Sequence, residues 1–216
     1  MGILRRLTEK PWLTPGLDPR AEPDAERLQT LPAAAVGLRV YFGVATVMFA
    51  LIGVLMVTRM GGHGLVAAQQ PDWKPMVWPP LLWVNTGVLI LSSAAWEWAR
   101  AAGLRGQLAS LRAGLIAGGV LALAFLAGQL TVWRQLEDAG CGLTATTMSA
   151  FFYLITALHG LHLMGGLAVW GRTTAKVLAG GKAAEVQQSV ELCTIYWHFL
   201  LLVWLVMLGL LLLNRR

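Results

Sequence analysis

Five long apolar runs determine what this chain of 216 residues can fold into. They cover residues 38–58, 80–99, 113–133, 148–171 and 189–213, and charged residues collect between them. A helix needs about 20 apolar residues to cross a hydrocarbon core of about 30 Å, and each run meets that length. Only 13% of the residues are charged, against about 25% in a typical soluble domain. The sequence therefore predicts an all-α integral membrane bundle of five transmembrane helices.

Lysine and arginine are distributed unequally between the two sides of such a bundle. One side holds twelve of them (Arg5, Arg6, Lys10, Arg20, Arg27, Arg39, Arg100, Arg105, Arg112, Arg172, Lys176 and Lys182) and the other holds five (Arg59, Lys74, Arg134, Arg215 and Arg216). Cytoplasmic loops are enriched in these residues, so we expect a cytoplasmic N-terminus and a periplasmic C-terminus. The net charge of +6 is then a topology signal, and nucleic acid is not an expected partner.

The first 35 residues differ in composition from the rest of the chain. They are charged, contain no hydrophobic segment of their own, and carry five prolines: Pro11, Pro15, Pro19, Pro23 and Pro32. Proline interrupts a helix because it lacks a backbone donor, so we expect a partly extended cytoplasmic tail and no signal peptide. The predicted organisation is a tail over residues 1–35 and one five-helix transmembrane domain over residues 36–216.

Two ionisable residues stand inside the last apolar run. Glu191 precedes His198 by seven residues, close to two helical turns, so both side chains lie on one stripe of the helix. An acidic residue at the centre of a membrane costs roughly 2.5 to 3.5 kcal/mol, and this stripe therefore needs a polar partner. His159 and His162 in the preceding run lie at a similar depth and could face it. With Tyr196, these residues predict a structural polar seam between the two helices.

The same histidines leave other chemistries open. His162 with His198, or His159 with His198, could ligate a b-type haem from opposed helices. A carboxylate-bridged di-metal site is not expected, because the chain has no Glu-x-x-His motif. A hydrogen-bonded seam satisfies buried polar groups without a cofactor and is the interpretation that the residues favour. We predict no catalytic, cofactor-binding or metal-ligating residue, since no nucleophile–base pair or phosphate-binding loop is found.

Several other polar residues within the runs are interpreted as helix-packing contacts. They are Asn85, Ser92, Ser93 and Gln129. Side chains of these kinds commonly hydrogen-bond to a neighbouring helix inside a membrane. Glu97 stands three residues before Arg100, which predicts an ion pair on a single helix. The glycine-rich stretch 114–119 lies within a run, and we expect it to be a packing surface.

Four segments carry recognisable motifs. The fourth run contains Phe151-Phe-Tyr-Leu-Ile-Thr-Ala-Leu-His-Gly-Leu-His-Leu-Met-Gly-Gly166, and the fifth contains Val190-Glu-Leu-Cys-Thr-Ile-Tyr-Trp-His-Phe199, followed by Trp204. The second contains Leu82-Trp-Val-Asn-Thr86 with Ser92-Ser93, and the third contains Phe125-Leu-Ala-Gly-Gln129. In this order, over roughly residues 36–213, the motifs resemble the helices of subunit III of the haem–copper oxidases. The five-helix length is similar to the short bacterial form of that subunit.

The resemblance implies a role within a larger complex. A subunit of this family carries no haem or copper of its own and packs directly on the catalytic subunit I. Haem and copper are expected in the partner subunits, I and II. The chain would retain bound phospholipid and support proton uptake and durable turnover. The complex, in the bacterial cytoplasmic (inner) membrane, would reduce O2 to water, pump protons and take electrons from cytochrome c.

Two departures from the family pattern favour a structural role. Thr46 stands where many members have a glutamate in the first helix, and Leu201 stands where the family has an acid after its Tyr-Trp-His-Phe string. The alternatives are a subunit III-like component of a quinol oxidase or nitric oxide reductase, and an autonomous b-haem membrane cytochrome. A lipid-binding or assembly protein without a permanent partner is a further alternative.

Overall fold

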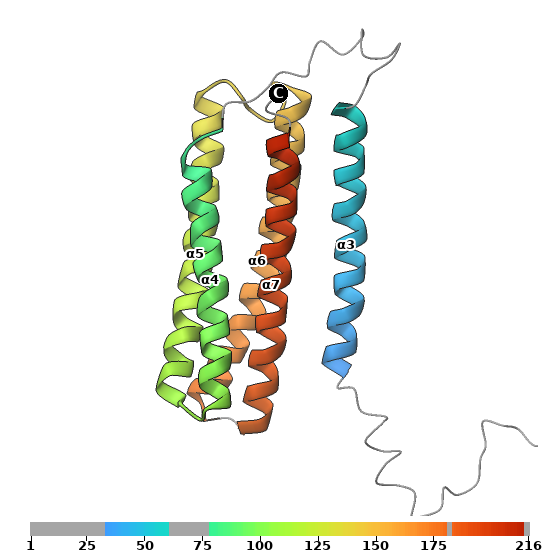
Figure 1. The fold of residues 1–216 in the computed structure, drawn as a ribbon. Coiled ribbons are helices and arrows are strands. Elements are labelled where there is room, and N and C mark those ends of the chain that lie inside the picture. Colours follow the sequence, from blue (N-terminus) through green and yellow to red (C-terminus); the bar gives the residue numbers. More distant parts are fainter. Residues whose placement is uncertain (1–32, 61–77, 181–182, 214–216) are drawn as a thin grey trace, which may run out of the picture. The chain divides into compact units, whose positions relative to one another are not determined.

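The computed structural model describes residues 33–60, 78–180 and 183–213 (Figure 1). These segments form five α-helices and contain no strand, which confirms the predicted all-α class. The helices are α3 (Ala33–Met60), α4 (Leu81–Leu104), α5 (Leu108–Asp138), α6 (Thr147–Leu178) and α7 (Ala183–Leu213). Nearly all of the predicted N-terminal tail, and residues 61–77 of the loop before α4, lie outside the described residues.

The chain divides into two units at Val40. The first, Met1–Val40, contributes to the described structure only the beginning of α3. The second, Tyr41–Arg216, holds the rest of α3 and the four following helices. All the packing described below belongs to the second unit.

Helices α4 to α7 form a closed four-helix arrangement. Each of α4 and α6 packs against both α5 and α7 (Figure 1). Large aromatic side chains fill the space that the four helices enclose, among them Trp96, Phe125, Phe152 and Trp197. Trp96 and Trp197 stack with ring centroids 5.4 Å apart, which joins α4 to α7. The order of helices around this ring decides which polar residues can meet.

The turns between the helices follow directly from the sequence. Gly106 and Gly140 have φ values of 70° and 74°, which suit the left-handed residue that ends a helix. The amides of Gln107 and Cys141, one residue further on, donate to the carbonyls of Ala102 and Leu136 at 3.0 and 2.8 Å. These are Schellman contacts, and they allow α4, α5 and α6 to follow one another through short turns.

The start of α6 is fixed by a reciprocal cap. The Thr146 side chain accepts from the Ser149 amide at 3.1 Å, and the Thr146 amide donates to the Ser149 hydroxyl at 3.0 Å. This capping box satisfies two amides that would otherwise lack partners at the helix end. It sets the register of α6 and therefore the direction in which its histidines point.

Small residues on α5 allow its neighbours to approach closely. A Cβ atom added to Gly114 would lie 2.8 Å from Ala99 Cβ, and one added to Gly118 would lie 2.7 Å from Trp96 Nε1. On the α6 side, Trp170 packs over Gly119 and donates its indole N–H to the Leu115 carbonyl at 2.8 Å. The glycine-rich stretch is thus a packing surface, as its composition predicted.

Four of the five helices are long and apolar enough to cross a membrane. These segments are Ala34–Arg59, Leu108–Asp138, Thr147–Leu178 and Val186–Leu213. The protein is therefore a membrane protein with helical spans. Helix α4 is not among the four; it carries four buried polar residues, Asn85, Thr86, Ser92 and Ser93, and the charged residues Glu97 and Arg100.

Candidate functional site

Polar side chains from α4, α5 and α7 meet inside the four-helix arrangement. Asn85 Nδ2 donates to Gln129 Oε1 at 3.2 Å, which links α4 to α5. On the other side of α4, Trp204 Nε1 donates to Thr86 Oγ1 at 3.1 Å, which links α7 to α4. Both contacts are buried, so these groups are paired with protein where no water or lipid competes. Asn85 and Gln129 therefore act as interhelical contacts.

The two serines of α4 have different environments. Ser92 Oγ donates to the Gly118 carbonyl of α5 at 2.9 Å. Ser93 is also buried, but its hydroxyl has no hydrogen-bond partner among the described residues. Of the four predicted packing residues, Asn85, Gln129 and Ser92 thus make hydrogen bonds between helices. The Ser93 side chain is small and buried and makes no such bond within the described residues.

His159 lies in the apolar interior. Its side chain is 1% exposed and packs between Phe125 of α5 and Trp204 of α7, with ring centroids 5.9 and 5.0 Å away. Neither ring nitrogen has a hydrogen-bond partner among the residues that the structure describes. His159 thus belongs to the aromatic core.

His162, three residues later, faces α3. Its ring packs on Phe49 and Tyr41 of α3, with centroids 5.3 and 5.8 Å away, and its Nδ1 donates to the Leu158 carbonyl at 2.7 Å. Tyr196 of α7 donates its hydroxyl to the His162 carbonyl at 2.7 Å and lies 3.1 Å from the Tyr41 hydroxyl. The hydrogen bond from Tyr196 to His162 therefore joins α7 to α6. Tyr41 of α3 contacts both of these residues, and Phe49 of α3 contacts His162.

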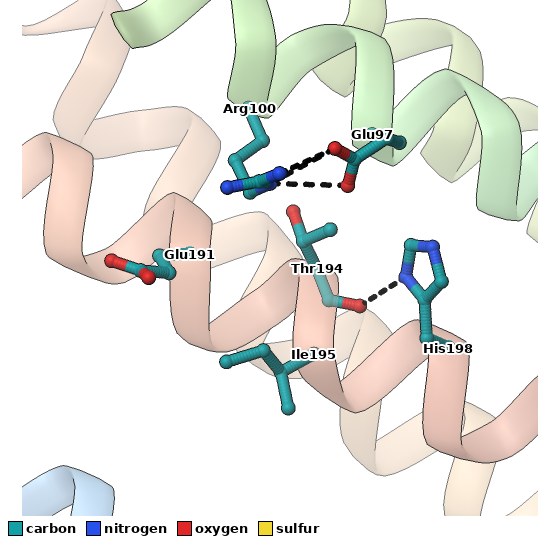
Figure 2. A pocket seen from close by; sticks show the side chains of 6 residues that line it. All are labelled: Glu97, Arg100, Glu191, Thr194, Ile195 and His198. Carbon is teal, nitrogen blue, oxygen red and sulfur yellow. Dashed lines mark hydrogen bonds and ion pairs between the residues drawn. The ribbon is translucent and has the colours of Figure 1, made fainter.

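Glu191 and His198 lie on a different side of α7. With Glu97, Arg100, Thr194 and Ile195 they line an open hollow of about 280 Å³ between α4 and α7 (Figure 2). Arg100 donates to both oxygens of Glu97, from Nη2 at 2.5 Å and from Nε at 3.0 Å. The ion pair predicted from their spacing is therefore confirmed.

The five predicted seam residues are therefore divided among three environments. Only His162 and Tyr196 are brought together by a hydrogen bond, and it uses the histidine backbone. No hydrogen bond joins Glu191 to a histidine or to Tyr196 within the described segments, and His198 Nδ1 donates to the Thr194 carbonyl of its own helix at 2.8 Å. The stripe predicted to meet α6 borders α4 instead, where Glu97 and Arg100 line the same hollow.

The positions of the three histidines that the structure describes do not suit a haem held between two of their imidazoles. His162 is directed to α3 and His198 to the hollow beside α4, while His159 is enclosed by Phe125 and Trp204. A bis-histidine haem needs two imidazoles that face each other across the iron. Among the described residues there is likewise no group of three or more His, Cys, Asp or Glu that could hold a metal ion.

Sequence reasoning missed the residues that complete these environments. Tyr41 and Phe49 were not connected with His162, and the ion pair of Glu97 and Arg100 was not connected with Glu191. The sequence held a signal for the connection of Glu97 and Arg100 with Glu191, because α4 and α7 each carry ionisable residues inside or next to an apolar run. It held none for the connection of Tyr41 and Phe49 with His162, since an aromatic residue in an apolar run fits any face of a helix.

These features define a class: a helical membrane protein whose buried polar groups mainly join its own helices. Comparison with known proteins then gives the family. The family model described as "Cytochrome c oxidase subunit III" matches residues 72–212, which include all of α4, α5 and α6 and nearly all of α7. The chain belongs to the cytochrome c oxidase subunit III family, as its motifs suggested.

Individual relatives carry related names. The chain is 25% identical over 158 residues to "Cytochrome bo(3) ubiquinol oxidase subunit 3" of Pseudomonas aeruginosa, a match that covers 73% of this chain and 72% of the relative. It is 31% identical over 142 residues to "Cytochrome c oxidase subunit 3" of Synechocystis, covering 63% of this chain and 60% of that protein. For "Probable cytochrome c oxidase subunit 3" of Mycobacterium tuberculosis the identity is 31% over 121 residues, covering 56% and 59%. The chain thus spans about three fifths of the length of the last two relatives.

Proposed function

We propose that this chain is the cofactor-free subunit III of a bacterial haem–copper terminal oxidase. The complex lies in the cytoplasmic membrane, reduces O2 to water with electrons from cytochrome c, and pumps protons. Subunit I, on which this chain packs directly, holds the reaction centre, and subunit II completes the complex. The chain supports the stability of the complex, lipid retention and proton uptake, and none of its own residues is catalytic.

The family match over α4 to α7 is the observation that carries this proposal. The contacts of the matched residues agree with a supporting role. Asn85, Gln129 and Trp204 make helix-to-helix hydrogen bonds, and His159 is packed among aromatic rings. These residues of the family motifs thus serve packing in this chain. Redox chemistry is expected in the partner subunits.

A fifth transmembrane crossing, by α4, is part of the proposal. Its 24 residues would rise about 36 Å at 1.5 Å each, enough for a core of about 30 Å. Its mean hydropathy is lowered by Asn85, Thr86, Ser92 and Ser93, all of which are buried. Its exposed large residues are apolar, among them Trp83, Val84, Ile90 and Leu91. Apart from the Glu97–Arg100 pair near its C-terminal end, the surface that α4 would offer to lipid is therefore apolar. The proposed orientation places the N-terminus in the cytoplasm and the C-terminus in the periplasm.

The test is purification of the affinity-tagged chain from native membranes in mild detergent. We expect a large many-helix subunit to accompany it in equal amount, and the sample to consume O2 with reduced cytochrome c. Recovery of the intact chain alone, at detergent concentrations that preserve other respiratory complexes, would contradict the proposal and favour an assembly or lipid-binding protein.

A ubiquinol oxidase is the second candidate, because one relative bears the name of a bo(3) ubiquinol oxidase subunit. This chain is not expected to contact the electron donor in either case, so its residues do not separate the two. The purified complex does. Faster O2 consumption with ubiquinol than with reduced cytochrome c would assign the quinol enzyme, and nitric oxide reduction without O2 reduction would assign a reductase.

A further inference from the structure

The hollow between α4 and α7 is a polar surface with no occupant from the described part of this chain. Glu191, Ile195, His198 and Leu202 follow one another at spacings of four, three and four residues, so they form one stripe along α7. All four side chains are exposed, and Ile195 is 46% exposed. Figure 2 shows three of them, Glu191, Ile195 and His198, beside Glu97 and Arg100 of α4.

The depth of His198 excludes bulk water as its ordinary surroundings. It stands twelve residues after the start of the membrane-spanning segment Val186–Leu213 and fifteen before its end. At 1.5 Å per residue these separations are about 18 and 22 Å. Ionisable residues at such depth almost always face protein or an aqueous cavity. His198 faces outward from the helix bundle into the open hollow, and a protein surface that covers the hollow would separate it from lipid.

The side-chain groups of the hollow that lack a partner determine which kind of group can cover it. Glu97 is satisfied by Arg100, whereas Glu191 has no ion pair or hydrogen bond among the described residues. His198 Nδ1 donates to the Thr194 carbonyl, so in the neutral ring Nε2 is left as an acceptor. The hollow therefore offers a carboxylate and an imidazole acceptor, with one negative charge in excess. Its complement is a group that only donates, which in proteins is a guanidinium or an ammonium.

We propose that the hollow lined by Glu97, Arg100, Glu191 and His198 receives an arginine or lysine side chain from a transmembrane helix of a partner subunit. This inference rests on the proposed function, which supplies the partner. Ile195 and Leu202 give the partner helix an apolar surface around the charged contact. A lipid headgroup at the membrane surface could meet Glu191, five residues into the span, but not His198, seven residues deeper, so a partner that covers both is a protein.

Photo-crosslinking tests the proposal directly. A benzophenone amino acid replaces Ile195 in the otherwise unchanged chain, and the complex is irradiated in native membranes before purification. We expect an adduct with a different, larger protein chain. An adduct only with lipid, or only within this chain, would overturn the proposal while co-purification of the complex left the proposed function standing.

A charge variant gives a second, independent readout. Glu191→Gln keeps the shape of the side chain and removes its charge, and we expect the fraction of chain retained on the purified complex to fall at least tenfold. Glu137→Gln, which alters an exposed carboxyl near the far end of α5, is the matched control and should be retained like wild type. Equal retention of both variants would contradict the proposal. If wild type itself brings no partner, the proposed function fails and this inference fails with it.

Discussion

At the scale of single residues, His159 illustrates how a polar side chain can serve an apolar core. It is enclosed by Phe125 and Trp204, and its ring nitrogens have no partner among the described residues. A buried polar group without a hydrogen bond contributes through its shape and opposes folding through its polarity. The two contributions can be separated by substitution.

We predict that His159→Phe is tolerated and His159→Ala is not. Phenylalanine preserves the ring contacts, so the free energy of unfolding should stay within about 1 kcal/mol of wild type or rise. Alanine leaves a cavity and should cost about 2 to 5 kcal/mol. Thermal unfolding of the detergent-solubilised protein measures both. If phenylalanine is as damaging as alanine, a ring nitrogen makes an essential contact and the core assignment is wrong.

Tyr196 makes the opposite kind of contact, because its hydroxyl bonds to the His162 carbonyl and to the Tyr41 hydroxyl. Tyr196→Phe removes both hydrogen bonds and should lower the free energy of unfolding by about 1 to 3 kcal/mol, at about 0.5 to 1.5 kcal/mol for each. Tyr41→Phe removes only one of them and should cost less. Unfolding in a denaturing detergent, followed by tryptophan fluorescence, compares the two. An equal or larger loss for Tyr41→Phe would show that the bond to the His162 carbonyl contributes nothing.

The residues that share one face of a helix could be predicted from the sequence. The neighbouring helix that this face borders could not. Helical periodicity places Glu191 and His198 on one stripe, and the structure agrees. Because α7 touches both α4 and α6, the rotation of α7 about its own axis decides which of them the stripe borders. Periodicity carries no information about this rotation. The contacts of Asn85 and Ser92 were easier to predict, because either neighbour would have satisfied them.

At the scale of elements, α5 is shaped by its glycines. Gly118 lets the Trp96 ring of α4 approach, and the same backbone accepts the Ser92 hydroxyl. Without a hydrophobic force between helices in lipid, close contact of this kind is what holds membrane helices together. The contact also brings Trp96 to its stacking partner, Trp197.

We predict that Gly118→Ala destabilises the protein by about 1 to 3 kcal/mol, the usual cost of overpacking. The added Cβ would lie 2.7 Å from Trp96 Nε1, so the indole must move. Gly87→Ala on α4 is the matched control, because nothing lies within 4 Å of its added Cβ. Alanine there should be neutral or stabilise by up to about 1 kcal/mol, since it favours the helix. Thermal unfolding of the two variants decides, and similar values would refute the packing role.

The sequence also predicted where the helices lie, with a systematic shortening. The fourth run was predicted over residues 148–171, whereas α6 extends over Thr147–Leu178. Hydropathy marks the part of a helix that lipid surrounds, while the helix itself continues until a cap such as Gly140 after α5. Helix α4 differs in another way. It was predicted as a span but is not among the four apolar helices, and four of its polar residues are buried in the bundle.

At the scale of the whole molecule, the orientation of each turn depends on whether α4 crosses the membrane. With five crossings and a cytoplasmic N-terminus, Gly106 and Gly180 lie in the cytoplasm and Gly142 in the periplasm. If α4 did not cross, all three positions would be reversed. Alkaline phosphatase fused after Gly142 should therefore be active, and fusions after Gly106 and Gly180 inactive. The reverse pattern would remove α4 from the set of spans.

We propose that the chain itself carries no redox centre and belongs to a complex that does. A reduced-minus-oxidised visible spectrum, recorded on the chain expressed alone and on the chain purified from native membranes, tests it most directly. We predict a featureless spectrum for the isolated chain and haem bands for the native preparation. Haem bands in the isolated chain that disappear in His198→Ala would contradict the account and make this protein an electron carrier in its own right.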